Sequence, residues 1–354
     1  MEKGANITLS HTVPVRRPGF LVQDVVQRLH AKGVLIEDLF PLGPAASTVL
    51  DGEAPDLSFS EAASFFEHAA RVTEQPDFGF LMGLRRDFRL LGLVAYSALS
   101  AATLAEFLNA FSRNLFCYSG GVQAKLTNTG KMVWQVTEQP HLPHRQYLEF
   151  LVTLLFKAAR MYLEPRSGSQ VLSAKAVWLD LSDGNRNGER EAFWGCPLIH
   201  ETGRFEIHFN GSDLRRQMRN VDPFLSRLIE GFATLQAQED QRLQNTLVHR
   251  LRTVMYQKLA DPGLTQEAVA QELGMSVRTL SRELQRLNMR FFEELDDIRQ
   301  DLACRYLYET EWTSANVAEQ LGYASVSSFN DAFRRWTSTT PTKFRRKVRA
   351  TLER

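Results

Sequence analysis

Apolar residues in the first part of the chain follow both helical and strand spacings. Helices are expected at 20–31, 60–71, 103–116 and about 145–163. Val122–Thr127 and Met132–Thr137 alternate in character and flank Asn128-Thr129-Gly130, so they predict a β-hairpin. Further strands are expected at 174–180 and 205–209. This mixture predicts an α+β domain that combines helices with a small antiparallel sheet.

Residues 222–259 carry a helical pattern. Asp222 is placed to cap the helix and Pro223 suits its first turn, whereas Asp261-Pro262-Gly263 ends the run. The apolar residues of its first half recur at three- and four-residue steps, at Leu225, Leu228, Phe232 and Leu235. A face of this kind either packs on its own domain or dimerises, and the pattern leaves both open.

The C-terminal part of the chain contains an internal repeat. Val269-Ala270-Gln271-Glu272-Leu273-Gly274 matches Val317-Ala318-Glu319-Gln320-Leu321-Gly322 at an offset of 48 residues, and four of the six residues are identical. Beyond the glycine the offset becomes 49, because the second copy has one residue more in its turn.

Each copy has the features of a helix-turn-helix. In the first copy Ala270 permits a close helix approach, Gly274 allows a left-handed turn, and Ser276 is placed to cap the next helix. Leu280 and Leu284 would hold that helix on the core and leave its other side free for a major groove. The equivalent residues of the second copy are Ala318, Gly322, Ser325, Phe329 and Phe333. With a helical connector at about 292–309, the repeat predicts an all-α domain of two helix-turn-helix units.

Charge is distributed in step with this repeat. The whole chain has a formal charge of only +1, from 42 Lys and Arg against 41 Asp and Glu. Residues 274–290 nevertheless hold four Arg and one acid, the connector 293–311 holds seven acids and two Arg, and 334–354 hold eight basic residues and one acid. Basic segments at these places predict phosphate contacts.

Composition and remaining motifs exclude several classes. The 354 residues, 44% of them hydrophobic and 23% charged, suggest two globular domains. Three separated cysteines (Cys117, Cys196, Cys304) fit a reducing compartment, and no secretory signal is expected. Leu90–Ala105 is too short and too polar for a membrane span and predicts a buried helix. We therefore expect a soluble, cytoplasmic protein.

The sequence contains no recognisable catalytic motif. His141-Leu142-Pro143-His144 has metal-like spacing, but the proline opposes a helix and no acid or cysteine cluster accompanies it, so a loop is favoured over a metal site. Motifs for serine hydrolases, zinc proteases, phosphate loops and dinucleotide binding are missing. The sequence thus predicts a non-enzyme with no metal and no cofactor.

Residues from about 245 to 350 resemble the DNA-binding domain of the AraC/XylS transcription regulators. The matching stretches include Leu273-Gly274-Met275-Ser276, Arg278-Thr279-Leu280, Leu302-Ala303, Val317-Ala318, Leu321-Gly322-Tyr323, Ser328-Phe329 and Phe333-Arg334-Arg335-Trp336. Residues from about 20 to 215 are similar to the arabinose-binding-type sensor domain of that family, at Leu91-Gly92-Leu93, Ala102-Thr103-Leu104 and Phe193-Trp194-Gly195-Cys196-Pro197.

This resemblance implies that two recognition helices enter successive major grooves. Carried over by position, the expected DNA contacts of the first helix are Arg278, Thr279, Ser281 and Arg282. Those of the second are Val326, Ser327, Asn330 and Asp331. Lys343, Arg345 and Arg346 are expected to contact phosphates.

Three residues depart from the family pattern. Asp331 stands where arginine is usual, and a carboxylate there repels phosphate and could only accept from a base such as cytosine. Asn288 and Ser338 replace glycines; asparagine tolerates the left-handed conformation, and serine does so less readily. We expect the second recognition helix to read DNA weakly, through Asn330 and apolar contact from Val326.

These features predict a sequence-specific, DNA-binding transcription regulator. We expect an effector-sensing and dimerising domain at 1–220, a helical linker at 221–245 and a DNA-binding domain at 246–354. The expected partners are double-stranded DNA, a small-molecule effector and a second copy of the chain, with no membrane; activation through RNA polymerase is implied by the resemblance alone.

Two alternatives stay open. One is a constitutive dimeric regulator without an effector. The other is an enzyme domain fused to a DNA-targeting module, which would need a reactive cysteine or a metal cluster within residues 1–215. The aromatic residues of the first domain either line an effector pocket or pack its core.

Overall fold

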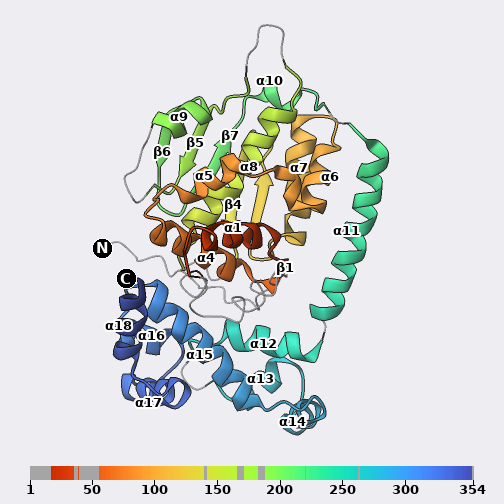
Figure 1. The fold of residues 1–354 in the computed structure, drawn as a ribbon. Helices are drawn as coiled ribbons and strands as arrows, with labels where there is room; N and C mark the ends of the chain where they lie inside the picture. The colour runs from red at the N-terminus through yellow and green to blue at the C-terminus, as the bar shows by residue number, and fades with distance from the viewer. Residues whose placement is uncertain are drawn as a thin grey trace, which may run out of the picture. The chain divides into compact units, whose positions relative to one another are not determined.

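The chain folds into two compact units, drawn as a ribbon in Figure 1. The N-terminal unit comprises Pro14–Glu138 and His144–Gln238, and the C-terminal unit comprises mainly Glu239–Arg354. The computed structural model describes residues 17–35, 39, 56–138, 142–165, 171–181, 188–219, 221–244, 246–261 and 264–352. Among these, no helix is long and apolar enough to cross a membrane.

Helices of the N-terminal unit match the predicted segments closely. The longer ones are α1 (Phe20–His30), α4 (Phe59–Val72), α5 (Phe78–Arg85), α7 (Leu104–Asn114) and α8 (Arg145–Tyr162). The shorter ones are η1 (Phe88–Leu91), α6 (Leu93–Leu99), η2 (Leu115–Cys117), α9 (Gly188–Trp194) and α10 (Gly211–Leu214). The single buried helix expected at 90–105 is instead broken, because Gly92 takes a φ of 57° between η1 and α6.

Five strands form a sheet in the order β3-β4-β7-β5-β6. They are β3 (Val122–Leu126), β4 (Lys131–Val136), β5 (Ala176–Leu179), β6 (Leu198–His200) and β7 (Phe205–His208). The predicted hairpin is confirmed, with Ala124 opposite Trp134. The expectation of a purely antiparallel sheet is corrected, because β5 and the short, unpredicted β6 run parallel. A separate antiparallel pair is formed by β1 (Arg17–Pro18) and β2 (Asp56–Leu57).

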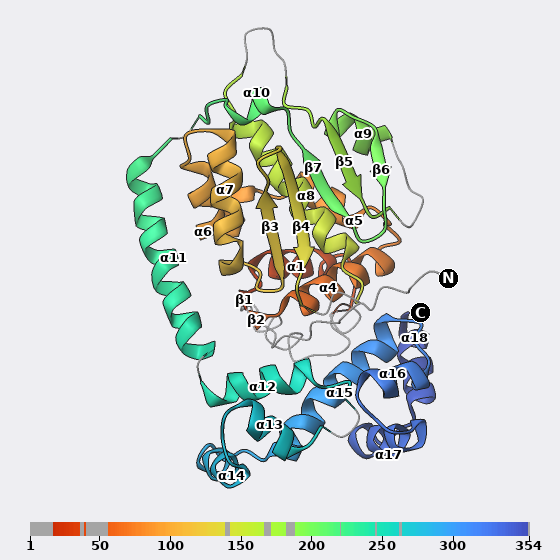
Figure 2. The ribbon, with the colours of Figure 1, turned by 180° about the vertical axis from the view of Figure 1, so that it is seen from behind.

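Aromatic side chains fill the space between the sheet and the helices on one of its faces, and Figure 2 shows the strands lying in front of α8. Phe111 of α7 meets Trp134 of β4 edge-on at 5.6 Å between ring centroids, and Phe156 of α8 meets Phe209 at 6.0 Å. Of the aromatic residues left open between a pocket and the core, most are buried: Phe65, Phe66, Phe107, Phe111, Trp134, Phe150 and Phe156. Their main role in the described structure is therefore packing.

The helical run from Asp222 to Leu259 is confirmed as two successive helices, α11 (Pro223–Gln244) and α12 (Leu247–Gln257). The predicted cap is present: the Asp222 carboxylate accepts hydrogen bonds from the backbone N–H groups of Phe224 and Leu225, at 3.1 and 2.9 Å.

The described part of the C-terminal unit is helical throughout. After α12 come α13 (Gln266–Glu272), α14 (Val277–Arg286), α15 (Phe291–Glu309), α16 (Ser314–Gln320), α17 (Val326–Thr337) and α18 (Pro341–Leu352). The predicted connector is α15, which packs against α12, α16, α17 and α18. The two halves of the repeat, α13–α14 and α16–α17, share one core, which includes Leu251, Val269, Leu280, Leu302, Tyr306, Phe329 and Phe333.

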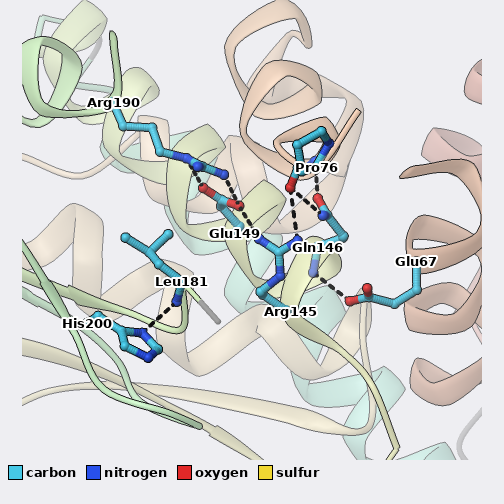
Figure 3. A network of polar contacts seen from close by, with 9 residues as sticks. Glu67, Pro76, Arg145, Gln146, Glu149, Leu181, Arg190 and His200 are labelled. Atoms are coloured by element: carbon cyan, nitrogen blue, oxygen red, sulfur yellow. Dashed lines mark hydrogen bonds and ion pairs between the residues drawn. The ribbon is translucent and has the colours of Figure 1, made fainter. Parts of the chain in front are cut away.

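A buried polar network in the N-terminal unit ties α8 to the helices around it (Figure 3). Glu149 lies between two arginines: one carboxylate oxygen is 2.7 Å from Nε of Arg190, and the other is 3.7 Å from a guanidinium nitrogen of Arg145. The Arg190 side chain is 0% exposed and its guanidinium lies 5.6 Å from the centroid of the Phe80 ring. An arginine that is fully buried away from water requires the opposite charge of Glu149.

The same network also fixes the start of α8 (Figure 3). The backbone N–H of Gln146 donates to the Glu67 carboxylate at 2.8 Å, and the Gln146 side chain donates to the Pro76 carbonyl at 2.7 Å. Burial raises the pKa of Glu67, while the hydrogen bond from Gln146 opposes that shift. Beside these contacts in the same view, the Leu181 N–H donates to Nδ1 of His200.

We expect Arg190→Met to lower the free energy of unfolding of the N-terminal unit by about 3 kcal/mol, because Glu149 would stay buried without its main partner. Adding Glu149→Gln should recover most of the loss, since the second variant removes the unpaired charge. Urea unfolding followed by tryptophan fluorescence measures both. An Arg190→Met protein as stable as the parent would show that the pair does not stabilise the fold.

Candidate nucleic-acid interface

The first helix-turn-helix holds α14 by its inner side. Gly274 takes a φ of 70° and ends α13, as the repeat predicted. Ser276 caps α14 by accepting a hydrogen bond from the N–H of Thr279 at 3.1 Å. Leu280 and Leu284 are buried in the core, so the opposite side of α14 faces outward.

That outward side of α14 carries polar and basic residues at helical spacing: Arg278, Ser281, Arg282 and Gln285. The first three are predicted DNA contacts, and they share one face. Gln285 was not predicted, although its spacing of one heptad from Arg278 would have indicated it. Thr279, also predicted, is partly buried and its hydroxyl lies 2.8 Å from that of Ser276, so it supports the helix cap.

Contacts around these residues leave their charges accessible. The Gln266 side chain donates to the Ser281 hydroxyl at 2.8 Å and so links α13 to the exposed side of α14. Arg282 and Arg286 both lie 3.4 Å from Glu283, but the two arginine side chains are well exposed. Exposed pairs of this kind hold their partners weakly, so both arginines can exchange Glu283 for another anion.

The second helix-turn-helix repeats the first with aromatic anchors. Gly322 has the same φ of 70° as its equivalent, and Ser325 caps α17 by accepting from the N–H of Ser328 at 3.1 Å. Phe329 and Phe333 are buried at the positions that leucines hold in α14. The predicted equivalence of the two copies is therefore confirmed down to the capping hydrogen bond.

The outward side of α17 differs from that of α14 in charge. It presents Ser327, Asn330, Asp331 and Arg334, with Val326 exposed at the first position. Asp331 makes no ion pair with any residue that the structure describes. Arg334 is exposed one heptad beyond Ser327, at the position equivalent to Gln285, and was not among the predicted contacts. Its positive charge offsets the negative charge of Asp331 on this face.

Basic residues elsewhere in the unit are engaged in holding its helices together. Arg335 of α17 reaches Asp296 of α15 at 2.6 Å. Arg299 of α15 donates to the Leu321 carbonyl at 3.0 Å and lies over the Tyr323 ring at 4.7 Å. The acidic connector therefore orients part of the second helix-turn-helix.

The predicted phosphate contacts in α18 divide into two kinds. Lys343 and Arg346 are exposed. Arg345 instead donates to the backbone carbonyl of Leu307 at 2.8 Å and to that of Trp312, and so ties α18 to the end of α15. The Leu307 carbonyl is one of the last four of α15, where a cation is favoured, and Trp312 lies in the segment that follows the helix.

Both predicted left-handed positions are confirmed. Asn288 has a φ of 55° between α14 and α15, and Ser338 has a φ of 57° at the end of α17. Each lets the chain turn sharply into the next helix without glycine, at a higher conformational cost for serine.

The two turn glycines are alike in backbone but not in surroundings. A Cβ placed on Gly274 would meet nothing within 4 Å, whereas one on Gly322 would lie 2.2 Å from the Leu259 carbonyl oxygen and 3.0 Å from that of Asp261. The turn of the second copy therefore packs directly on the chain that follows α12, and only glycine fits there.

Family models match both parts of the chain. The model of the arabinose-binding domain of AraC transcription regulators, N-terminal, matches residues 48–218. A helix-turn-helix domain model matches residues 269–347, which include both units described above. Together the two models span more than two thirds of the chain.

Curated relatives are similar to the chain, two of them over most of their length. The chain is 28% identical over 301 residues to the HTH-type transcriptional regulator VirS of Mycobacterium tuberculosis, covering 82% of this chain and 84% of the relative. It is 26% identical to the ornithine utilization regulator of Pseudomonas aeruginosa, covering 88% and 91%. The transcriptional activator NphR of a Rhodococcus species is 29% identical over 126 residues, covering 36% and 37%. These relatives are transcription regulators and not enzymes.

Substituting alanine for each turn glycine separates the cost of a left-handed backbone from the cost of a clash with Leu259. We expect Gly274→Ala to destabilise the C-terminal unit by about 1–2 kcal/mol, the cost of a left-handed alanine. Gly322→Ala should cost several kcal/mol, because the same backbone cost is joined by a clash with Leu259. Thermal unfolding of the two full-length variants, side by side, measures the difference. Equal losses would show that the contact with Leu259 is dispensable.

Proposed function

The chain belongs to the AraC-type family of helix-turn-helix transcription regulators, and on that premise we propose that it binds specific DNA sites under the control of a small molecule held in its N-terminal unit. The observation that carries the DNA part is the pair of exposed faces on α14 and α17, each opposite a buried pair of residues. A helix anchored in this way presents its free side to a major groove.

Base reading is assigned to the outward residues of both helices. Arg278 and Arg282 each offer a guanidinium that can grip guanine with two hydrogen bonds, and Ser281 lies between them. On α17, Asn330 suits adenine, Val326 suits the methyl group of thymine, and Asp331 suits only a donor such as the amino group of cytosine. Thr279 and Ser327, near the N-termini of the two helices, complete the proposed set.

Phosphate contacts are assigned to exposed cations outside the grooves. Lys343 and Arg346 of α18 are free to neutralise backbone charge, and Arg334 of α17 joins them at the edge of its helix. The Arg345 guanidinium already binds two carbonyls, so we assign it first to holding α18 in place.

A small pocket in the N-terminal unit is our candidate for the effector site. It lies among α1, α4, η2 and α8, has a volume of about 10 Å³, which is room for roughly one water molecule, and is lined in part by Ser58, Phe59, Tyr118, Ser119 and Tyr147. Burial raises the pKa of Tyr118 well above its usual range and that of Tyr147 to about 12, so both stay neutral hydrogen-bonding groups. Hydroxyls beside an aromatic wall suit a neutral polar group, and a molecule of metabolite size would bind here only if the lining side chains move apart.

The remaining parts of the proposal follow the family and the relatives. We assign effector sensing and dimerisation to residues 1–220, linkage to 221–245 and DNA binding to 246–354. One relative is named for ornithine utilization and another as an activator, which favours a metabolite effector and positive control through RNA polymerase. Because a transcription regulator must reach the chromosome, we place this protein in the cytoplasm.

We expect Arg282→Ala to weaken binding to the best DNA site by about 1–3 kcal/mol and binding to random DNA much less, because it removes a base contact. Lys343→Ala should weaken both about equally and lower the salt dependence by about one counterion, because it removes a phosphate contact. Fluorescence anisotropy on both DNAs across a salt series measures this. The site itself comes from footprinting on genomic fragments, where protection of about two helical turns per half-site is expected. Equal losses for both variants would contradict the assignment.

A true effector should stabilise the N-terminal unit by about 2.7 kcal/mol when present at a hundredfold excess over its Kd. Thermal shift against a panel of neutral and charged metabolites identifies it. Tyr147→Phe and Ser119→Ala should abolish that shift, whereas Ser212→Ala, on exposed α10, should retain it. Specific DNA binding that no compound changes, with no shift from any, would instead support a constitutive regulator.

A further inference from the structure

The hydrophobic core of the C-terminal unit contains a residue from a distant part of the chain. Leu142 is 3% exposed and belongs to this core, whose other buried residues in the described chain lie between Leu251 and Phe333. Leu142 and Pro143 form part of the C-terminal unit, whereas His144 belongs to the N-terminal unit. We call Leu142–His144 the anchor segment, because it places a side chain of the N-terminal sequence in the core of the DNA-binding unit.

The downstream end of the anchor segment touches the candidate effector pocket. His144 immediately precedes α8, and its ring centroid lies 6.3 Å from that of Phe59. Phe59 is the first residue of α4 and lines the pocket together with Tyr147, whose ring centroid is 5.5 Å away. Only Pro143 separates Leu142 from His144, and its fixed φ leaves little slack between them. A displacement of His144 is therefore passed on to Leu142.

Residues on the other side of Phe59 hold it in place. Glu138 is 2% exposed, and its carboxylate accepts hydrogen bonds from the backbone N–H and the hydroxyl of Ser60, at 3.1 and 2.7 Å. A Cβ placed on Gly121 would lie 2.4 Å from Cβ of Phe59 and 2.6 Å from Cβ of Glu138. Phe59 therefore has no free space toward Gly121, and its ring is also in contact with His144.

We propose that Leu142 couples the pocket to the DNA-binding unit, so that widening of the pocket withdraws Leu142 from the C-terminal core. While Leu142 is seated, the pocket has room for roughly one water molecule. A molecule of metabolite size requires Phe59 and Tyr147 to move apart. Because Phe59 cannot move toward Gly121, it moves against His144, and the anchor segment shifts. This inference rests on the proposed function and specifies its regulation.

Withdrawal of Leu142 changes the restraint on the DNA-binding unit. In the described part of the chain, the two units are joined at the anchor segment and again along α11. Once Leu142 has left the core, the connection through α11 is the one that remains of these two. A unit held at one place turns through a wider range than a unit held at two. The effector thereby changes which half-site spacings the DNA-binding units can occupy.

The burial of a single leucine has the right size for such a switch. Full burial of a leucine side chain favours the buried state by roughly 10- to 150-fold. Allosteric coupling between two sites is typically about 5- to 150-fold. A small molecule that binds the widened pocket more tightly can therefore reverse the seating of Leu142, whereas a larger apolar anchor would resist it.

The first test is hydrogen–deuterium exchange of the full-length protein without any ligand. We expect Leu142→Ala to raise exchange about tenfold both in the C-terminal core and at the starts of α4 and α8, because the anchor segment loses its seat. Leu264→Ala is the matched control: it truncates another buried leucine of the same core and should raise exchange in the C-terminal unit alone.

A milder variant keeps this test decisive if Leu142→Ala folds poorly. Leu142→Val retains most of the side chain and should give the same pattern more weakly. Circular dichroism confirms that each variant is folded. If the Leu142 variants loosen the C-terminal unit alone, as Leu264→Ala does, Leu142 is an ordinary core residue and the proposal is overturned.

The second test runs in the opposite direction, because coupling between two sites is reciprocal. Phe59→Leu removes the ring that contacts His144 and should raise exchange in the helices of the C-terminal core about threefold or more. Phe107→Leu is its control: it removes a fully buried ring of α7 that lies 5.6 Å from Phe88, and its effect should stay within the N-terminal unit. A C-terminal core that does not respond to Phe59→Leu overturns the coupling.

DNA binding keeps this inference separate from the proposed function. On paired half-sites at varied spacing, we expect the parent to prefer one spacing by about tenfold. Leu142→Ala should lose most of that preference while binding a single half-site as Leu264→Ala does. If the parent prefers no DNA site at all, the proposed function fails, and the exchange experiments alone decide whether Leu142 is coupled to the pocket. A parent without a spacing preference, or a Leu142→Ala protein that keeps the parental preference, overturns the proposed restraint.

Discussion

Burial of one side of each recognition helix is the constraint on which the DNA-binding unit depends. Leu280 and Leu284 in α14, and Phe329 and Phe333 in α17, insert into a single core around α15. With period 3.6, burial at two positions four apart fixes which residues of the helix face outward. The same hydrophobic contacts that stabilise the unit thereby aim its polar side chains, and loss of packing would disorder the interface before any DNA contact was removed.

Local signals in the sequence were sufficient for much of this unit. A capping serine, a turn glycine and an apolar pair lie within eleven residues of each other, so Ser276 and Ser325 cap as predicted. Asn288 and Ser338 are left-handed as predicted. Contacts between distant segments were not visible in that way. The parallel pairing of β6, the closeness of Gly322 to Leu259 and the carbonyls held by Arg345 all join residues far apart in sequence. Arg334 and Gln285 lie one heptad from the predicted contacts Ser327 and Arg278, but the resemblance to the family does not single them out.

Basic charge serves two purposes in the C-terminal unit, and only the structure separates them. Arg299, Arg335 and Arg345 each bind a carbonyl or carboxylate of the protein and fix one helix against another. The cations of α14 and Lys343 of α18 have at most weak, exposed partners. A basic composition alone therefore overstates the charge available to DNA. The asymmetry between the faces also follows: α14 is strongly cationic, whereas Asp331 offsets Arg334 on α17, so the first helix contributes more of the non-specific attraction.

The apolar residues of α11 show why an apolar helical pattern does not identify what the helix packs against. In the sequence, Leu225, Leu228, Phe232 and Leu235 are compatible with packing on the chain's own domain or on a second copy. The structure divides the apolar positions of the helix, because Ile229 and Ala233 take the inner side and leave Leu228, Phe232 and Leu235 outside. Exposed apolar surface and a glycine in mid-helix, Gly231, both lower the stability of this helix in water. The pattern of apolar residues therefore fixes that α11 is a helix, and only the structure shows which of them pack on its own unit.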